Sequence, residues 1–210
     1  MSSSEHAPEP VASRAAQYAG VLGALALAVS ACDAPLPASE TRWRSERADG
    51  IAAAILPAAR ASFAGLAFYP FDKAYKVRAM ITVERPPQAL QIAASDGRQR
   101  PAHRIGRVRL RLPGGAASLA VYSLDDLEAT SPGHLFLPFR DAGAGRETYG
   151  AGRYVEIEHL PGGVVEIDFN RAYNPDCAYG IVAQCPITPA ENTLAFVVGA
   201  GEKLPPGAGH

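Results

Sequence analysis

The sequence has almost no net charge and therefore lacks the broad basic excess that nucleic-acid binding favours. Its 210 residues contain 20 lysines and arginines against 21 aspartates and glutamates, which gives a formal net charge of -1. The arginine-rich stretch at residues 104–111 is too short to change this balance. With 48% hydrophobic residues, the chain is long enough to bury a core, so we expect one globular domain with appendages and no nucleic-acid partner.

The sequence also lacks a hydrophobic run that would span a bilayer comfortably. Arg14 precedes a run of apolar and small residues, 19–29, which is typical of the hydrophobic region of a secretory signal. The next residues, Val29-Ser30-Ala31-Cys32, resemble the lipobox of bacterial lipoproteins, in which the cysteine is acylated and becomes the mature N-terminus. Residues 1–32 are therefore predicted to be a lipoprotein-type signal peptide, with Cys32 as the lipidation site. An uncleaved signal anchor or a misassigned start codon is the alternative.

The signal predicts where the protein resides. We expect it in the cell envelope, lipid-anchored to a membrane and facing the periplasm. Residues 33–40, which include Pro35 and Pro37, are expected to form an extended tether. A single β-rich domain is then expected over residues 41–204, with a flexible tail at residues 205–210.

Cysteine is scarce, with three in the whole chain. Once Cys32 is assigned to the lipobox, Cys177 and Cys185 remain as a pair in a turn-rich region, and in an oxidising compartment they are candidates for a disulfide. A zinc site would need two further ligands, and neither cysteine belongs to a C-x-x-C motif. Free buried thiols are a third possibility. We favour the disulfide and expect no metal site at these cysteines.

Histidine is also scarce, and His103, His134 and His159 are the only histidines inside the expected domain. None lies in a motif that pairs it with a serine or cysteine nucleophile, so the sequence does not support nucleophilic catalysis. Gly150-Ala151-Gly152 is not a nucleotide-binding fingerprint, because it lacks a third glycine and precedes a strand instead of opening a helix. This motif is more typical of a place where two backbone segments pack closely.

The sequence is rich in β-strand patterns. Alternating apolar and polar residues predict about eight strands separated by turn residues, at 75–84, 89–94, 104–112, 118–124, 135–141, 153–159, 164–170 and 192–198. The connections between them are mostly too short for helical crossovers. The predicted fold class is therefore mainly β, an antiparallel β-roll or barrel with short N-terminal helices.

The helices are expected within residues 41–61. Apolar and long side chains recur there at helical spacing, and the pattern is interrupted near Gly50 and again at Pro57. The side chains expected on one helical face are those of Trp43, Arg47, Ile51, Ile55 and Leu56.

Strands 153–159 and 164–170 are predicted to form a hairpin in one particular register. If residues 161–163 make a three-residue loop with Gly163 in the left-handed conformation, Val155 lies opposite Phe169 and Ile157 opposite Ile167. All the apolar side chains then share one face of the hairpin.

The same register places like charges opposite each other on the other face. Glu156 faces Asp168 and Glu158 faces Glu166, an arrangement that destabilises a sheet unless something compensates. Solvent alone is the simplest source of screening. The other candidate is the basic strand at 104–112, and we expect one of its outward arginines to approach: Arg107, Arg109 or Arg111.

Several runs of residues, in order along the chain, resemble those of one protein family. They are LFLPFRD (135–141), ETYGAGRY (147–154), DFNRAYNP (168–175), CAY (177–179), CP (185–186), ENTL (191–194) and AGEK (200–203). They resemble the bacterial domain-of-unknown-function family 1684, over about residues 43–203. Gly143 departs from the family, whose members often carry a Thr-Ser-Gly turn there. The resemblance implies a shared fold and a shared pocket around these motifs, but no substrate, cofactor or reaction.

Charged and aromatic residues gather in these runs, where we predict a pocket that binds a small polar or anionic ligand. The candidate ligand-binding residues are Arg140, Asp141, Glu147, Tyr149, Arg153, Asp168, Asn170, Tyr173 and Asn174. A small-molecule hydrolase that uses paired carboxylates, with or without a divalent metal, is the alternative. Two carboxylates in hydrogen-bonding reach at the base of an open cleft would favour the enzyme, whereas an arginine against each carboxylate would favour a binding or structural role.

Arg153 is predicted to be the centre of this region. Because it follows the Gly150-Ala151-Gly152 turn, we expect its guanidinium to point into the domain, towards Asp141, Glu147 or Asp168. The pair Asn170 and Asn174 is consistent both with capped turns and with amides presented to a ligand.

Overall fold

A computed structural model describes residues 35–61, 63–181 and 183–205. Residues 36–210 make up one compact unit, and the unit before them falls almost wholly outside the described part. The predicted signal peptide and the lipidation site Cys32 also lie outside the described residues, as does most of the predicted tail. Within the part of the chain that the structure describes, no helix combines the length and the apolar character needed to cross a bilayer.

The described chain begins with helix α1 (Ala38–Ala54), followed by the short helix α2 (Pro57–Arg60). Helix α1 includes residues 38–40, which the sequence analysis places in the tether. The predicted break near Gly50 is absent, because a single exposed glycine costs a helix only about 1 kcal/mol and tertiary packing outweighs it. Ile51 and Ile55 are buried as predicted, but Leu56 is 49% exposed, because the chain leaves the helical path before it.

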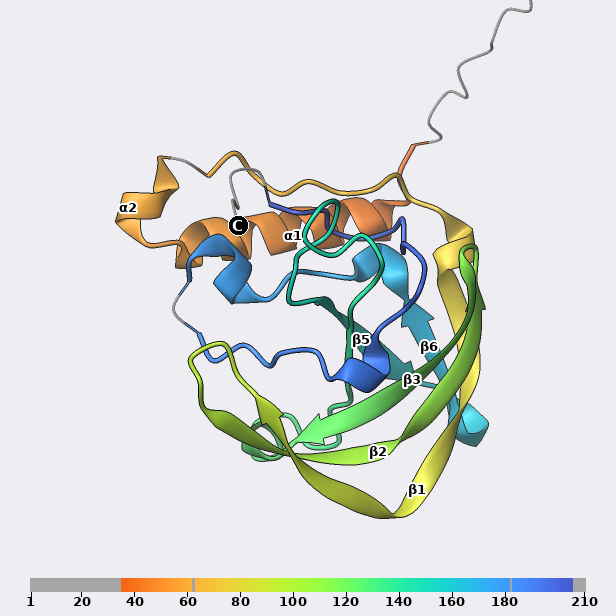
Figure 1. Cartoon of the computed structure of the whole chain (residues 1–210). Helices are drawn as coiled ribbons and strands as arrows, with labels where there is room; N and C mark the ends of the chain where they lie inside the picture. Colours follow the sequence, from red (N-terminus) through yellow and green to blue (C-terminus); the bar gives the residue numbers. More distant parts are fainter. Residues whose placement is uncertain (1–34, 62, 182, 206–210) are drawn as a thin grey trace, which may run out of the picture. The chain divides into compact units, whose positions relative to one another are not determined.

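Six antiparallel strands close into a barrel in the order β1-β2-β3-β4-β5-β6, which confirms the predicted fold class. The strands are β1 (Lys76–Ala93), β2 (Gln99–Leu112), β3 (Gly115–Leu124), β4 (Phe136–Phe139), β5 (Arg153–His159) and β6 (Val164–Asp168). Figure 1 shows α1 lying across one end of this barrel. Closure of the ring leaves no free sheet edge along its wall, which is the usual reason for a β domain to form a barrel.

Two of the strand predictions were wrong. The predicted strands 75–84 and 89–94 fall, except for Tyr75 and Ala94, within the one long strand β1, whose pairing with β2 is irregular between Val83 and Gln88. Residues 192–198 are not a strand; this segment forms one bridge, between Arg140 and Thr193, and its Phe196 carbonyl accepts a hydrogen bond from the Ala142 N–H. Pairing this short does not make a strand, and neither error changes the fold class.

The barrel interior is filled by alternate residues of the strands. Val108, Leu119, Leu137 and Ile167 are fully buried there. Their neighbours point to the other side of the sheet, where Ala120 and Phe136 are buried in a second hydrophobic cluster. Phe139 and Phe169 meet edge to face inside the barrel, with ring centres 5.2 Å apart. The period of two in the sequence thus specifies which side chains line the core and which reach the outer surface.

The β5–β6 hairpin has the predicted register where its strands pair. Ile157 lies opposite Ile167, and the loop at residues 161–163 contains Gly163 with a positive φ of 76°. Val155 does not pair with Phe169 as predicted, because β6 ends at Asp168. There the Asp168 carboxylate accepts a hydrogen bond from the Asn170 N–H, and the chain turns into a short 3-10 helix.

Glu158 does lie opposite Glu166, but the predicted source of compensating charge was wrong. The cations beside Glu166 are Lys76 at 2.6 Å and Arg78 at 2.9 Å, both from β1. The reason is topological: β1 pairs with β6, and β2 lies on the far side of β1. The β2 arginine Arg107 instead contacts Glu191.

Candidate functional site

The residues predicted as one pocket divide into a buried network and an exposed groove. Arg153 is the centre of the buried network, with its side chain 1% exposed. Its guanidinium donates a hydrogen bond to the carboxylate of Asp141 at 2.6 Å. Asp141 is one of the three partners predicted for Arg153. Desolvation lowers the pKa of Arg153, although the Asp141 charge opposes that shift. A fully enclosed pair of this kind has no access to a ligand, so its role is structural.

Arg153 also fastens the C-terminal segment to the barrel. It donates hydrogen bonds to the backbone carbonyls of Val198 and Glu202, each at 2.9 Å, and to that of Ala200. These three carbonyls belong to a segment without regular secondary structure, so the arginine supplies the donors that a neighbouring strand would otherwise provide. The single side chain therefore holds together parts of the chain that are far apart in sequence.

Asp141 organises the loop that follows β4. One of its oxygens accepts from the Thr148 hydroxyl at 2.7 Å and from the Gly143 N–H at 2.9 Å. The other, besides binding Arg153, accepts from the Val198 N–H at 3.1 Å. In this loop, where Gly143 departs from the Thr-Ser-Gly turn of the family, Thr148 supplies the hydroxyl that binds Asp141.

A second buried network joins α1 to the C-terminal segment. Glu202 is fully buried and accepts hydrogen bonds from Arg47 of α1 at 3.0 Å, from the Asn174 N–H at 2.8 Å and from the Tyr179 hydroxyl. Burial, followed by the nearby Glu202 charge, raises the pKa of Tyr179. Every bond of this carboxylate is to a neighbouring structural element, so Asn174 and Glu202 serve to attach the helix to the barrel.

The other predicted residues lie in several places. Asn170 is buried and its amide bonds the backbone N–H and carbonyl of Asp72, each at 2.9 Å, so it caps a turn. Glu147 is exposed and accepts from the Tyr69 hydroxyl, and burial raises the pKa of Tyr69 to about 12. Arg140 is exposed and Tyr149 is half-buried, and neither contacts the groove described next.

The groove lies between α1 and the outer faces of β1 and β6, and it consists of two adjoining chambers. The first, of about 650 Å³, is called here the basic chamber because two lysines and two arginines line it; the second, of about 460 Å³, is called the aromatic chamber. These volumes are in the range of small-molecule sites. The two chambers share a wall made by Lys76, Glu166, Asp168 and Arg171.

Apart from Asp168, the basic chamber is built from residues that were not predicted as site residues. Lys73 and Arg78 line it, together with Glu40 at the start of α1 and the apolar side chains of Pro37 and Phe71. Glu40 is 1% exposed and is bound by Arg44 and Arg171, so its charge is neutralised. Hydrogen bonds from Lys76 and Arg78 lower the pKa of Glu166. Among the described residues Lys73 has no ion pair, so its charge is available in this chamber.

The aromatic chamber is lined by Trp43 of α1 and by Tyr173, with Glu156 and Glu158 of β5. Glu156 accepts from the Tyr173 hydroxyl at 2.7 Å and lies 2.8 Å from His134 Nε2. The hydrogen bond to Glu156 raises the pKa of His134. Asp168 and Tyr173 are thus the two predicted site residues that the structure brings together in a cavity.

Sequence patterns contained a partial signal for this groove. Lys76 and Arg78 alternate with Val77 and Ala79, which places both cations on the outer face of β1. Nothing in the sequence showed that this face would lie beside Glu166 and beneath α1, because those contacts join residues from opposite ends of the chain.

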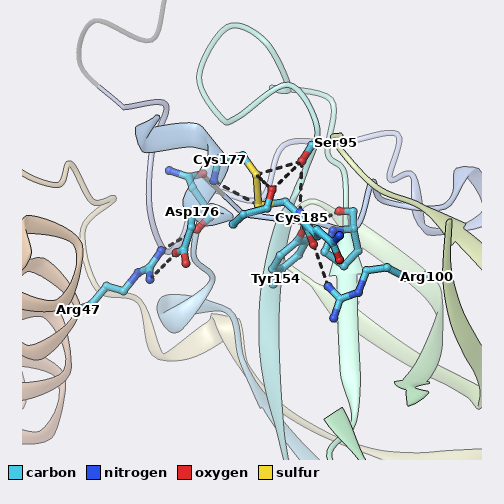
Figure 2. Close-up of a disulfide and its surroundings, with 11 residues drawn as sticks. Arg47, Ser95, Arg100, Tyr154, Asp176, Cys177 and Cys185 are labelled. Carbon is cyan, nitrogen blue, oxygen red and sulfur yellow. Dashed lines mark hydrogen bonds and ion pairs between the residues drawn. A yellow bond between two sulfur atoms is a disulfide. The ribbon is translucent and has the colours of Figure 1, made fainter. Parts of the chain in front are cut away.

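Cys177 and Cys185 are joined by a disulfide that closes a loop of turns beside the barrel. Figure 2 shows this loop between Arg47 of α1, which pairs with Asp176, and Arg100 of β2, which donates to the Gln184 carbonyl at 3.0 Å. The disulfide thus secures a segment that connects the helix with the barrel. Across the described ranges, no three or more histidine, cysteine, aspartate or glutamate side chains gather as a metal site would require.

Apart from Glu158, the carboxylates of the groove and of the buried networks are matched by cations or other donors among the described residues. In the described part of the chain, no two carboxylates are hydrogen-bonded to each other, which is the arrangement that would have favoured a carboxylate enzyme. The geometry therefore favours binding and structural roles for these acidic residues.

Comparisons with known proteins agree on a family without assigning a reaction. No curated protein matches the chain. A solved structure, the solution NMR structure of an uncharacterised protein of Haloarcula marismortui, is similar to this chain with 31% identity and a TM-score of 0.59, covering 79% of this chain and 92% of the other. The model of the family described as "Protein of unknown function (DUF1684)" matches residues 61–203. This chain belongs to that family.

Proposed function

We propose that this protein is a binding module of the cell envelope that holds a small anionic ligand in the groove between α1 and the β1–β6 face. The observation that carries the proposal is the basic chamber, where Lys73 and Arg78 line a cavity of about 650 Å³ together with apolar side chains. Cationic side chains against a partly apolar wall are the usual means by which proteins hold small anions.

The charge arrangement supports this assignment over a catalytic one. Glu166 is contacted by both Lys76 and Arg78, and Glu40 by two arginines, so the acidic groups in the basic chamber are compensated. Lys73 remains without an ion pair among the described residues. An added anion would meet uncompensated positive charge there, whereas a carboxylate mechanism would need an acid and a base with separate environments.

The anchoring of the module is part of the proposal. The lipobox-like residues 29–32 support acylation at Cys32, and the domain begins with α1 at Ala38. A short linker after two or three acyl chains would keep the groove in the periplasm beside the membrane surface. The basic chamber does not depend on this anchor, so the two parts of the proposal are tested separately.

A thermal-shift measurement tests the ligand. The full chain, solubilised in a nonionic detergent, is heated with inorganic phosphate or a small carboxylate such as citrate, and a ligand of the folded state raises its melting temperature. The shift should shrink in Lys73→Gln and in Arg78→Gln. It should persist in Arg109→Gln, which removes an exposed arginine of β2 that lines neither chamber. Equal shifts in all four proteins would show that any anion effect is nonspecific and would reject the site.

A further inference from the structure

The two chambers of the groove differ in the sign of their charge. The residues found only in the basic chamber include Lys73 and Arg78 against the neutralised Glu40. The residues found only in the aromatic chamber include Glu156 and Glu158 and no cation. The groove therefore changes from positive to negative along its length.

The wall between the chambers is itself compensated. Lys76 lies 2.6 Å from Glu166 and 4.0 Å from Asp168, so this part of the groove carries charges of both signs in contact. Because the charges of this wall cancel, it repels neither the anionic end nor the cationic end of a ligand that lies across it. The uncompensated charge is left at the two ends of the groove, and this arrangement suits a ligand with one charge of each sign.

The aromatic chamber has the features that proteins use to bind alkylammonium groups. Trp43, whose ring is the strongest cation-binding surface among the side chains, lines it beside Tyr173. Each ring already has an arginine over it: Arg47 lies 4.9 Å from the centre of the Tyr173 ring, and Arg171 lies 6.0 Å from the centre of the Trp43 ring. Trp43 is therefore the less closely occupied of the two aromatic surfaces. Glu158 has no ion pair in the described part of the chain, and it lies directly opposite Glu166 on the neighbouring strand. Because Glu166 is already paired with Lys76 and Arg78, a bound cation would supply the counter-charge that Glu158 lacks.

We propose that the ligand of the groove is a small zwitterion, with its anionic group in the basic chamber and an alkylammonium group in the aromatic chamber beside Trp43 and Glu158. This inference rests on the proposed function and specifies the class of ligand for the same site. A free phosphate ester with an ammonium end and the headgroup of a zwitterionic phospholipid share this chemistry.

Calorimetric titration of the full chain in a nonionic detergent tests the inference with three probes: phosphocholine, inorganic phosphate and choline. Phosphocholine is expected to bind at least about tenfold more tightly than either fragment, which corresponds to about 1.4 kcal/mol or more from each end of the ligand. Trp43 is the only tryptophan, so its emission should change with phosphocholine and thereby report occupancy of the aromatic chamber.

Two variants separate the ends of the ligand. Glu158→Gln should weaken phosphocholine and choline about threefold or more and leave phosphate unchanged, since it removes an exposed charge that contacts only the cationic end. Lys73→Gln should weaken phosphocholine and phosphate and leave choline unchanged. The matched control is Glu46→Gln, an exposed glutamate of α1 that lines neither chamber, and it should alter none of the three.

The possible failures are distinguishable. If phosphate binds in a Lys73-dependent manner but phosphocholine binds no tighter, the zwitterion is rejected and the anion site stands. If neither phosphate nor phosphocholine binds, both the inference and the proposed function are rejected. If Glu158→Gln and Glu46→Gln behave alike towards phosphocholine, the placement of the ammonium group is overturned.

The source of the zwitterion is decided in nanodiscs that contain the full chain. When the discs are made of phosphatidylcholine, Trp43 emission equal to that of the phosphocholine-saturated protein would support a lipid headgroup. Emission equal to that of the free protein, together with a response to added phosphocholine, would support a soluble zwitterion. Emission equal to that of the free protein, with no response to added phosphocholine, would overturn the inference.

Discussion

Arg153 and Asp141 form an ion pair 2.6 Å long whose side chains are 1% and 0% exposed. The pair lies where the sequence suggested a ligand pocket, yet every hydrogen bond it makes is to another part of the chain. Buried ion pairs add little to stability over apolar residues, but removing one partner is costly because it leaves an uncompensated charge in the interior.

Replacing Arg153 with alanine should therefore destabilise the protein severely. Arg153→Ala leaves the Asp141 carboxylate without its cation and the carbonyls of Val198, Ala200 and Glu202 without their donor. The expected loss is about 3–5 kcal/mol in the free energy of unfolding, measured by denaturant titration. Arg109→Ala, on the exposed face of β2, is the control and should leave the midpoint nearly unchanged. A midpoint for Arg153→Ala equal to that of the control would contradict a structural role for the pair.

The two glycines of Gly150-Ala151-Gly152 should respond differently to alanine. Gly152 has a φ of 101°, and an added Cβ would lie 2.7 Å from the Phe139 carbonyl oxygen, which is fixed in β4. At Gly150 the nearest atom to such a Cβ is 3.8 Å away. Gly152→Ala is expected to lower the free energy of unfolding by about 1–3 kcal/mol or more, through a disfavoured φ and a steric clash. Gly150→Ala serves as the matched control, and equal thermal melts of the two variants would show that close packing at Gly152 is unimportant.

The contact between His134 and Glu156 predicts a pH-dependent contribution to stability. The pKa of His134 is raised by its hydrogen bond to Glu156, and the pKa of Glu156 is lowered by His134 and Tyr173 in opposition to desolvation. A raised pKa means that the folded state binds the proton more tightly. The stabilisation is therefore complete below the unfolded-state pKa of about 6.5 and is lost as pH rises through the higher folded-state value.

The comparison of wild type with His134→Asn measures this contribution. The difference in unfolding free energy should be larger at about pH 5.5, where Glu156 is still ionised, than at about pH 8.5. The same histidine substitution is then made in a Glu156→Gln background, where the charge of the acceptor is absent. There the difference in unfolding free energy should change less between about pH 5.5 and about pH 8.5 than it does with Glu156 present. A wild-type difference that is constant or grows with pH would reject the ion pair.

The lipid anchor is tested by metabolic labelling. If Cys32 is acylated, labelled palmitate should be incorporated into the wild-type protein and not into Cys32→Ser, because the thiol is the acceptor of the diacylglyceryl group. The control is Ser30→Ala, which keeps Cys32 and replaces one small residue of the lipobox-like run with another. This variant should still incorporate the labelled palmitate. Equal labelling of wild type and Cys32→Ser would rule out anchoring at this residue.

The sequence by itself determined the local features of the protein. The period of two assigned inward and outward residues, and the loop of Pro161-Gly162-Gly163 predicted a register that places Ile157 opposite Ile167. The buried direction of Arg153 was also predictable, because a glycine turn beside a strand indicates close backbone packing. The pattern and the hairpin register were predictable because they depend on residues that are near in sequence, whereas the partners that Arg153 meets in the interior lie far along the chain.

Only the tertiary structure decided where a ligand could bind. The prediction of a strand at 192–198 was wrong because this segment pairs with the barrel only over the bridge between Arg140 and Thr193, and sequence alone does not reveal how far a pairing extends. The groove arises because barrel closure sets β1 beside β6 and because α1 crosses the end of the barrel, which brings Trp43, Lys76 and Tyr173 together. Contacts between such distant segments depend on topology and packing, and the physical reason they escape prediction is that no local pattern records which outer faces will meet.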